Sequence, residues 1–290
     1  MVLLLQAVAD GVLLGLLYTV MAVGLSLTLG VLGIVNVAHG TFVVLGSFFA
    51  LGALRVLGWD PLVSVVAALP VFFLAGAVVD RVLIRRVARA PQLLGLLVLF
   101  GVMVAVESAA ILLWTTDTRV ITVPYTNRAL HLGAITLSEV RLIAGGIALL
   151  LVVLLHAGLR LTRFGKAIRA MAQNRDVAMV LGIDVGWLSM VVFGLGTATA
   201  GAGGVVLGMV FPFDPQTQIQ WLSWAFLVVL FGGLGGVGNT LAGGLTVGVI
   251  QALASVLLPF RYVFLVLYGL LAAILIVKGQ GLAAVRTRRI

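Results

Sequence analysis

The sequence predicts an all-α protein: a polytopic bundle of about eight transmembrane helices, some of them broken or re-entrant. Of its 290 residues, 62% are hydrophobic and only 9% are charged, whereas a soluble domain carries roughly 25% charged residues. The mean hydropathy of +1.27 agrees with this assignment. The apolar runs are long and continuous, so they favour helices over a β-barrel, whose strands alternate in segments of ~10 residues.

Nine apolar stretches follow one another along the chain, and we assign residues 1–290 to a single transmembrane domain. The stretches lie near 5–30, 33–54, 61–80, 93–115, 139–159, 187–210, 221–236, 240–258 and 261–277. Those at 221–236 and 240–258 are short and separated by glycines, so they form one broken span, one re-entrant segment or two crossings. No basic region or cleavage site precedes the first stretch, which we therefore expect to be a retained span.

The basic residues are grouped in a way that orients the spans. Thirteen of the 18 lysines and arginines fall in three clusters, which are Arg81, Arg85, Arg86 and Arg89; Arg160, Arg163, Lys166, Arg169 and Arg175; and Lys278, Arg286, Arg288 and Arg289. By the positive-inside rule these regions are cytoplasmic. The segments 116–138 and 211–220 are then external. This placement explains the net charge of +9 without nucleic acid, which we do not expect as a partner.

The segment 162–184 is too polar to cross a membrane, yet its pattern is that of a pair of amphipathic helices. Apolar residues recur at helical spacing and basic residues occupy the other side. Gly165 and Gly182 bracket the segment as helix stops would. Two interpretations remain open, a membrane-surface helix anchored by its charges and a docking platform for a cytoplasmic partner.

A break is expected at 30–40, which reads GVLGIVNVAHG. Polar side chains in hydrocarbon need partners, so Asn36 and His39 indicate either a tight helix–helix contact or an interruption that lines a path. Gly40 and the two other glycines of this run allow close packing or an unwound backbone.

The run at 232–243 reads GGLGGVGNTLAG and repeats this pattern. Both runs fit G-x-x-G-x-x-N-x-x-x-G, and the constant offset aligns Asn36 with Asn239 and Gly40 with Gly243. An internal repeat of this kind predicts two broken elements that face each other across a path. Asn36, His39, Gly40 and Asn239 are therefore the predicted translocation-path residues.

One carboxylate, Glu107, falls in the middle of an apolar stretch. It is expected to be either a proton-relay acid or a structural hydrogen-bond partner. The chain has no cysteines, and we predict no catalytic residue, no cofactor and no metal site. It also lacks a G-x-x-x-x-G-K-[ST] phosphate loop, so we do not expect it to hydrolyse ATP itself.

Three stretches together resemble the branched-chain amino acid ABC transporter permeases of the LivH type. Residues 11–50 are similar to the N-terminal signature of that family, and residues 230–253 to its glycine-rich C-terminal signature. The pattern T-x-x-G-x-A-x-R-A followed by A-x-x-L-G-I resembles the family's cytoplasmic coupling loop. It is carried here by Thr162, Gly165, Ala167, Arg169, Ala170, Ala178, Leu181, Gly182 and Ile183.

The resemblance implies the permease subunit of an ATP-binding cassette importer for branched-chain amino acids (Leu, Ile, Val) or related small amino acids or amides. It implies a bacterial or archaeal cell (inner) membrane, with the basic loops and the C-terminus cytoplasmic. The implied partners are membrane lipid, a second homologous permease or a second copy of the chain, two cytoplasmic ATPase subunits and an external solute-binding protein. The implied coupling residues are Gly165, Lys166, Arg169, Ala170, Ala178, Gly182 and Ile183.

The alternative function is a stand-alone proton-coupled secondary transporter or a channel, in which Glu107 carries the proton. In that case Glu107→Gln should abolish uptake, whereas an importer should tolerate the change and fail without its ATPases. A membrane scaffold that transports nothing is a third possibility, but it would not need two glycine–asparagine breaks.

Overall fold

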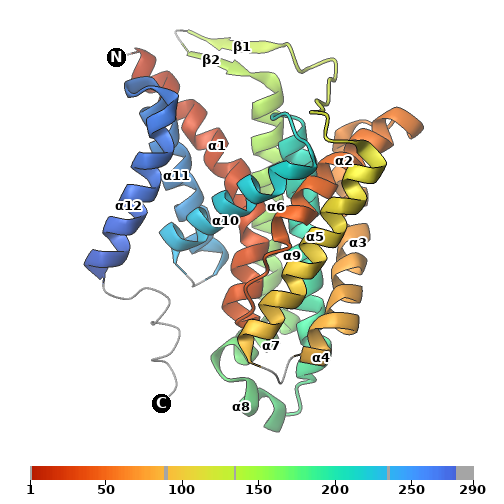
Figure 1. Cartoon of the computed structure of the whole chain (residues 1–290). Coiled ribbons are helices and arrows are strands. Elements are labelled where there is room, and N and C mark those ends of the chain that lie inside the picture. The colour runs from red at the N-terminus through yellow and green to blue at the C-terminus, as the bar shows by residue number, and fades with distance from the viewer. Residues whose placement is uncertain (1, 88–90, 134, 234–235, 279–290) are drawn as a thin grey trace.

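The computed structural model of the chain describes residues 2–87, 91–133, 135–233 and 236–278 (Figure 1). Arg89, Arg286, Arg288 and Arg289 of the predicted basic clusters lie outside these ranges. Within them, seven helices are long and apolar enough to cross a membrane, and a shorter apolar helix covers Val263–Ala273. The predicted polytopic helical bundle is thereby confirmed.

The elements follow the predicted apolar stretches closely. In chain order the helices are α1 (Val2–Leu27), α2 (His39–Leu57), α3 (Pro61–Val79), α4 (Arg85–Val87), α5 (Gln92–Trp114), α6 (Glu139–Leu161), α7 (Arg163–Gln173), α8 (Arg175–Val180), α9 (Val185–Gly208), α10 (Gln218–Gly232), α11 (Val237–Leu257) and α12 (Val263–Lys278). A hairpin of β1 (Ala129–Leu132) and β2 (Ile135–Ser138) precedes α6. π-Helical turns at Thr28–Leu32 and Asp80–Ile84 extend α1 and α3, and 3-10 turns occur at Pro215–Thr217 and Phe260–Tyr262.

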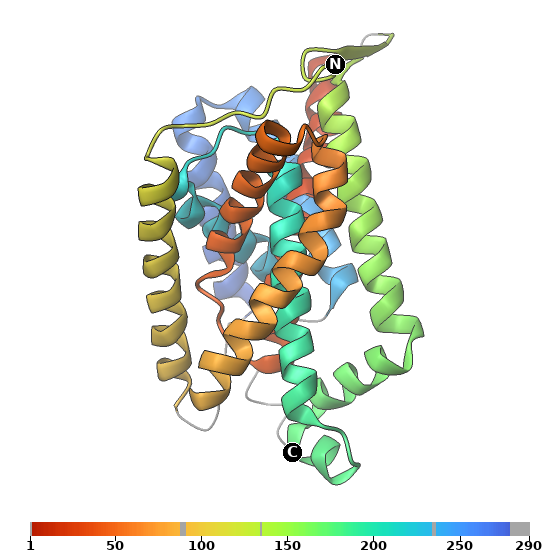
Figure 2. The same cartoon turned by 90° about the vertical axis from the view of Figure 1, so that its right-hand side faces the viewer.

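The bundle has two distinct ends. At the hairpin end, β1 and β2 lie beside the start of α1, and at the opposite loop end lie α7 and α8 (Figures 1 and 2). The hairpin is attached to α1 by one side chain, because Gln6 Nε2 donates to the Thr136 carbonyl at 2.7 Å and Thr136 N donates to Gln6 Oε1 at 2.9 Å. A second contact joins α1 to α6 nearby, where Arg141 lies 3.4 Å from Asp10.

The helices differ strongly in how much of their surface the bundle covers. In the most apolar stretch of each helix, 83% of the residues are buried in α9, 72% in α1 and only 17% in α5. Accordingly α5 stands at the edge of the bundle (Figure 2). The central helices approach closely through glycines: a Cβ on Gly15 would lie 2.7 Å from the Gly244 carbonyl oxygen of α11. Such small-residue contacts are a usual basis of helix association in membranes.

Both predicted breaks occur. Gly33 has φ of +67°, which ends the first helix, and the backbone from 33 to 38 is not helical before α2 begins partway along the bundle (Figure 2). Gly233 and Gly236 have φ of +81° and +123°, and they separate α10 from α11. With 15 residues α10 is about 22 Å long. It is thus shorter than the ~30 Å hydrocarbon core, so it is a partial span.

Candidate functional site

The predicted amphipathic helix pair is present as α7 and α8, and each helix has its own caps. Thr162 Oγ1 accepts from Gly165 N at 3.0 Å, and Asn174 Oδ1 accepts from Asp176 N at 3.0 Å. Gly182 has φ of +81° and ends α8, with Ile183 N donating to the Ala178 carbonyl at 3.0 Å. This is the backbone pattern that ends a helix at a left-handed residue. The prediction that Gly182 ends a helix is thereby confirmed.

The expectation for Gly165 as a helix stop is wrong, because it lies in the first turn of α7. A Cβ there would collide with the backbone of Leu159 in the last turn of α6. The guanidinium of Arg169 donates to the Leu159 carbonyl as well. Gly165 and Arg169 therefore fold α7 back against the end of α6, and both contribute to the shape of the loop.

The apolar face of the loop is buried against the bundle. Ile168, Met171 and Ala178 are 1–4% exposed and form one cluster with Leu27 of α1 and Leu188 of α9. A helix anchored at the membrane surface would instead place this face among lipids. The apolar face of α7 instead packs against other helices of the same chain. The loop is thereby joined to α1 and α9, the two most buried of the long helices.

The outer surface of the loop is both basic and apolar. Of the predicted coupling residues, Lys166, Arg169 and Gly182 are exposed, Ala170 and Ile183 are half-buried, and Gly165 and Ala178 are buried. Sequence reasoning missed the α8 patch, which we define as the exposed apolar residues Val177, Met179, Val180 and Leu181. Val180 is 86% exposed and Leu181 is 71% exposed. The patch lies on the outermost element of the loop end, beyond the ends of α3 and α5 (Figures 1 and 2).

The first break contains two fully buried polar side chains. Asn36 and His39 are both 0% exposed. His39 Nε2 lies 2.7 Å from the Met21 carbonyl of α1. Neither polar atom of the Asn36 side chain has a hydrogen-bond partner among the described residues. Gly40 packs directly on the Gln218 carbonyl at the start of α10, where a Cβ would not fit.

The second break lies at the other end of α10. Asn239 is exposed in the first turn of α11, and its carbonyl packs on Gly232, the last residue of α10. Gln218 and Gly232 are fourteen positions apart, which corresponds to about 21 Å along the helix. The structure therefore brings Asn36, His39 and Gly40 together at one end of α10 and Asn239 at the other. The sequence pattern did not reveal that α10 separates the two breaks.

Glu107 is part of a chain of polar side chains that sequence reasoning did not find. Gln218 Nε2 donates to Glu107 Oε2 at 2.6 Å, and Thr41 Oγ1 donates to Gln218 Oε1. Gln218 is 1% exposed and Thr41 is 4% exposed, so the chain connects the peripheral α5 to α10 and α2 in the interior. The sequence signal for this contact is Gln218 itself, a polar residue at the edge of an apolar stretch. It lies in the segment 211–220, which the sequence predicts to be external.

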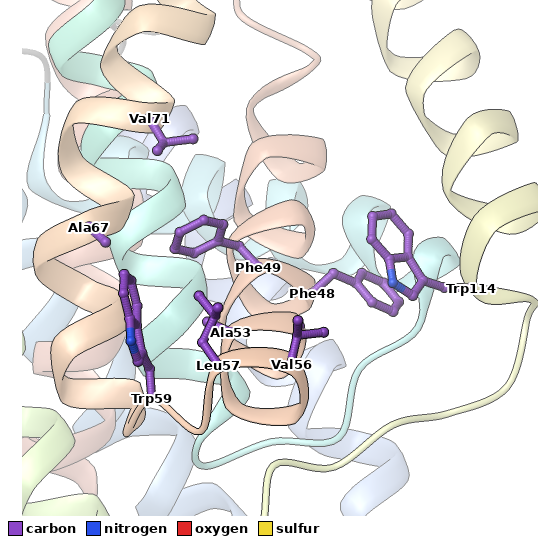
Figure 3. A pocket seen from close by; sticks show the side chains of 10 residues that line it. Phe48, Phe49, Ala53, Val56, Leu57, Trp59, Ala67, Val71 and Trp114 are labelled. Atoms are coloured by element: carbon purple, nitrogen blue, oxygen red, sulfur yellow. The ribbon is translucent and has the colours of Figure 1, made fainter.

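One open cavity at the edge of the bundle does not have the chemistry of an amino-acid site. It has a volume of about 510 Å³ and opens between α2, α3 and the end of α5. Its walls include Phe48, Phe49, Trp59 and Trp114, and Phe48 stacks on Trp114 with ring centroids 4.7 Å apart (Figure 3). These walls offer aromatic and aliphatic side chains and no charged group that would pair with an ammonium or a carboxylate. The described residues also contain no group of three or more side chains suited to hold a metal ion.

Comparison with known proteins agrees with this architecture. Residues 7–276 match the protein family described as branched-chain amino acid transport system / permease component. The chain is 28% identical to the high-affinity branched-chain amino acid transport system permease protein LivH of Salmonella typhimurium, over 96% of this chain and 94% of that protein. It is 26% identical to BraD of Pseudomonas aeruginosa, over 96% and 95% of the two chains.

An archaeal relative extends the comparison. The probable branched-chain amino acid transport permease protein LivH of Methanocaldococcus jannaschii is 29% identical over 92% of this chain and 87% of its own length. No solved structure matches the chain. Since the family match covers residues 7–276, from the first turns of α1 into α12, the chain belongs to the branched-chain amino acid transport system permease family.

Proposed function

We propose that this chain is the membrane-spanning permease subunit of an ATP-binding cassette importer and that the loop 162–184 couples it to ATPase subunits. The α8 patch is the observation that carries the proposal. The other apolar face of the loop is already buried against α1 and α9, yet Val180 and Leu181 remain exposed at the end of the molecule. Exposed apolar residues on a loop that also carries exposed basic residues such as Lys166 are typical of a protein interaction site.

The remaining assembly follows from the family. We propose two cytoplasmic ATPase subunits at the loop end, a second permease or a second copy of this chain in the membrane, and a solute-binding protein at the hairpin end. The basic residues of α4, α7 and α8 support a cytoplasmic loop end, because such residues concentrate on that side of a bacterial or archaeal membrane. The relatives' names support branched-chain amino acids as the solute.

We place the translocation path along the two breaks that flank α10. Asn36, His39 and Gly40 lie at one end of this partial span, and Asn239 lies at the other. Non-helical backbone at membrane depth is tolerated where protein or a water-filled cavity surrounds it. The unpartnered amide of Asn36 supports its assignment to the path, because a passing solute or water supplies the missing hydrogen bonds.

The test removes the α8 patch. Val180→Asp combined with Leu181→Asp should reduce co-purification of the ATPase subunits roughly tenfold or more and abolish ATP-driven uptake of labelled leucine. Leu130→Asp is the control, since Leu130 is 49% exposed on β1 at the opposite end and should leave ATPase association unchanged. Association and uptake at wild-type levels in the double variant would refute the docking role.

A further inference from the structure

A buried carboxylate lies beneath the coupling loop, at a point that neither sequence motifs nor the proposed docking surface use. Asp80 begins the π-helical turn after α3, and its side chain is 1% exposed. A buried charge is unfavourable unless it is paired and hydrogen-bonded. Arg85 Nε lies 3.5 Å from Asp80 Oδ2, and neither oxygen accepts a hydrogen bond from any described group. The 3.5 Å separation is long for a charge-assisted pair, which usually lies at 2.7–2.9 Å.

The unsatisfied carboxylate faces a small cavity where four parts of the fold meet. The cavity has a volume of about 30 Å³, which exceeds the roughly 10–15 Å³ that a water molecule needs. Its walls include Ile34 of the first break, Asp80, Arg175 of α8 and Ser189 of α9. The Ser189 hydroxyl is also buried without a partner among the described residues. Two polar groups with unused hydrogen-bonding capacity therefore share a space large enough for water or the tip of a side chain.

Two arginines act on Asp80, and they differ in how they are held. Arg85 also donates through Nη2 to the Gly186 carbonyl, so it is fixed between the end of α3 and the first turn of α9. Arg175 is exposed on the short helix α8, lines the cavity, and exerts its positive charge on the same carboxylate. The two oxygens of a carboxylate accept more donors than the one distant pair supplies. Arg175, which lines the same cavity, can fill that capacity when α8 moves towards α3.

We propose that Asp80 and Arg175 form a switchable ion pair that transmits movement of the coupling loop to the first break. This inference rests on the proposed function, since it assumes that the ATPase subunits move α8. In the structure the guanidinium lies at the cavity wall and the pair is not formed. When the ATPases push α8 inward, the Arg175 guanidinium enters the cavity and bonds to Asp80. Ile34, on the same wall and two residues before Asn36, is then shifted with it.

A switch of this kind fits the general behaviour of packed interfaces, which have discrete arrangements rather than a continuous range. It also accounts for a buried carboxylate at a helix end whose oxygens have no hydrogen-bond partner among the described residues. A purely structural carboxylate would be satisfied in the resting state, because unpaired buried polar groups are destabilising. Asp80 and Arg175 are thus positioning residues for transport, distant from the transported solute.

The test compares Arg175→Ala with Arg160→Ala in the assembled transporter in vesicles, with its ATPases and binding protein. Arg160 is a matched exposed arginine at the end of α6 that belongs neither to the α8 patch nor to the cavity beside Asp80. Arg175→Ala should keep ATPase association and ATP hydrolysis but lower the uptake per ATP hydrolysed roughly three- to thirtyfold. Arg160→Ala should leave this ratio unchanged. A purely structural role would alter thermal stability and leave the ratio intact.

The pair itself is tested by a double-mutant cycle. Asp80→Asn should lower the ratio to a similar extent, and adding Arg175→Ala should lower it no further, because coupled residues are not additive. Additive effects, or an Arg175→Ala ratio equal to the Arg160→Ala control, would overturn the proposal. If Asp80→Asn does not fold, the exposed Arg175→Ala alone decides. Wild-type protein that binds no ATPase would instead refute the proposed function, so the two failures are distinguishable.

Discussion

Gln218 donates its side-chain amide to the Glu107 carboxylate over 2.6 Å, and this bond connects the peripheral helix α5 to the interior. A glutamine at 107 would also accept this bond, so Glu107→Gln should retain uptake and thermal stability. Glu107→Leu should lower stability by about 1–3 kcal/mol, because it leaves the buried Gln218 amide unsatisfied. Uptake assays and thermal unfolding of purified protein check both variants.

The same pair of variants separates the importer from the proton-coupled alternative. If Glu107 relays protons, Glu107→Gln abolishes uptake although the protein folds normally. That outcome would contradict a structural role for the carboxylate. An importer retains uptake in Glu107→Gln and loses it when the ATPase subunits are omitted.

The two asparagines of the repeated pattern differ in accessibility, and the absence of native cysteines makes this simple to measure. Asn239→Cys should react readily with a small maleimide, because Asn239 is exposed. Asn36→Cys should react at least about tenfold more slowly in the resting protein, since Asn36 is 0% exposed and reacts only after local opening. A path through the first break predicts that turnover with ATP accelerates labelling at 36. Equal labelling with and without ATP would count against Asn36 as a path residue.

The close approach of α1 and α11 depends on glycine. A Cβ at Gly15 would lie 2.7 Å from backbone atoms of Gly244 and Leu245, so Gly15→Ala should destabilise the bundle by about 1–3 kcal/mol. Gly146→Ala is the control on the exposed side of α6, where nothing lies within 4 Å of the added Cβ. It should be neutral or stabilising by up to about 1 kcal/mol through helix propensity. Thermal unfolding in detergent measures both variants. Equal effects would show that the contact between α1 and α11 accommodates the added methyl group.

A tyrosine at the hairpin end should titrate abnormally. Burial, together with the hydrogen bond that Tyr125 donates to Asp60 Oδ1 at 3.0 Å, raises the pKa of Tyr125 above its ordinary value near 10. The contribution of the neutral Tyr125 side chain to the free energy of unfolding is complete below the tyrosine pKa of about 10 in the unfolded chain. It is lost as the pH rises through the higher folded value. Phenolate absorbance of the wild type against Tyr125→Phe measures this shift, and a normal titration of Tyr125 would contradict the contact.

Hydropathy predicted where the helices lie but not which of their faces meet. The stretch predicted at 139–159 became α6 over Glu139–Leu161, and Gly33, Gly233 and Gly236 of the predicted breaks adopt positive φ. Gln218 and Asp80 were missed, because each lies at the edge of an apolar stretch and is buried only by helices distant in sequence. Lipid tails and neighbouring helices are equally apolar, so composition does not distinguish a lipid-facing residue from one in the core.

The same limit applies to the loop. Periodicity and charge predicted the helix pair, and Gly182 ends α8 as expected. Gly165 was misassigned because its function is to allow contact with Leu159, which follows from the fold rather than from helix signals. The exposure of Val180 was equally invisible, since apolar residues at helical spacing indicate that a face is buried but do not identify the surface that buries it.

The seam between Gly15 and Gly244 has a consequence for biosynthesis. The two glycines are 229 residues apart in the chain. At a synthesis rate of about 5–20 residues per second, the ribosome needs roughly 10–50 seconds to reach α11 after α1 has emerged. During this interval the bare backbone groove of α1 is in the membrane without the helix that fills it. The nascent protein is therefore exposed to mispairing with other small-residue helices, and its insertion should depend on a translocon or chaperone that shields α1 until the C-terminal helices arrive.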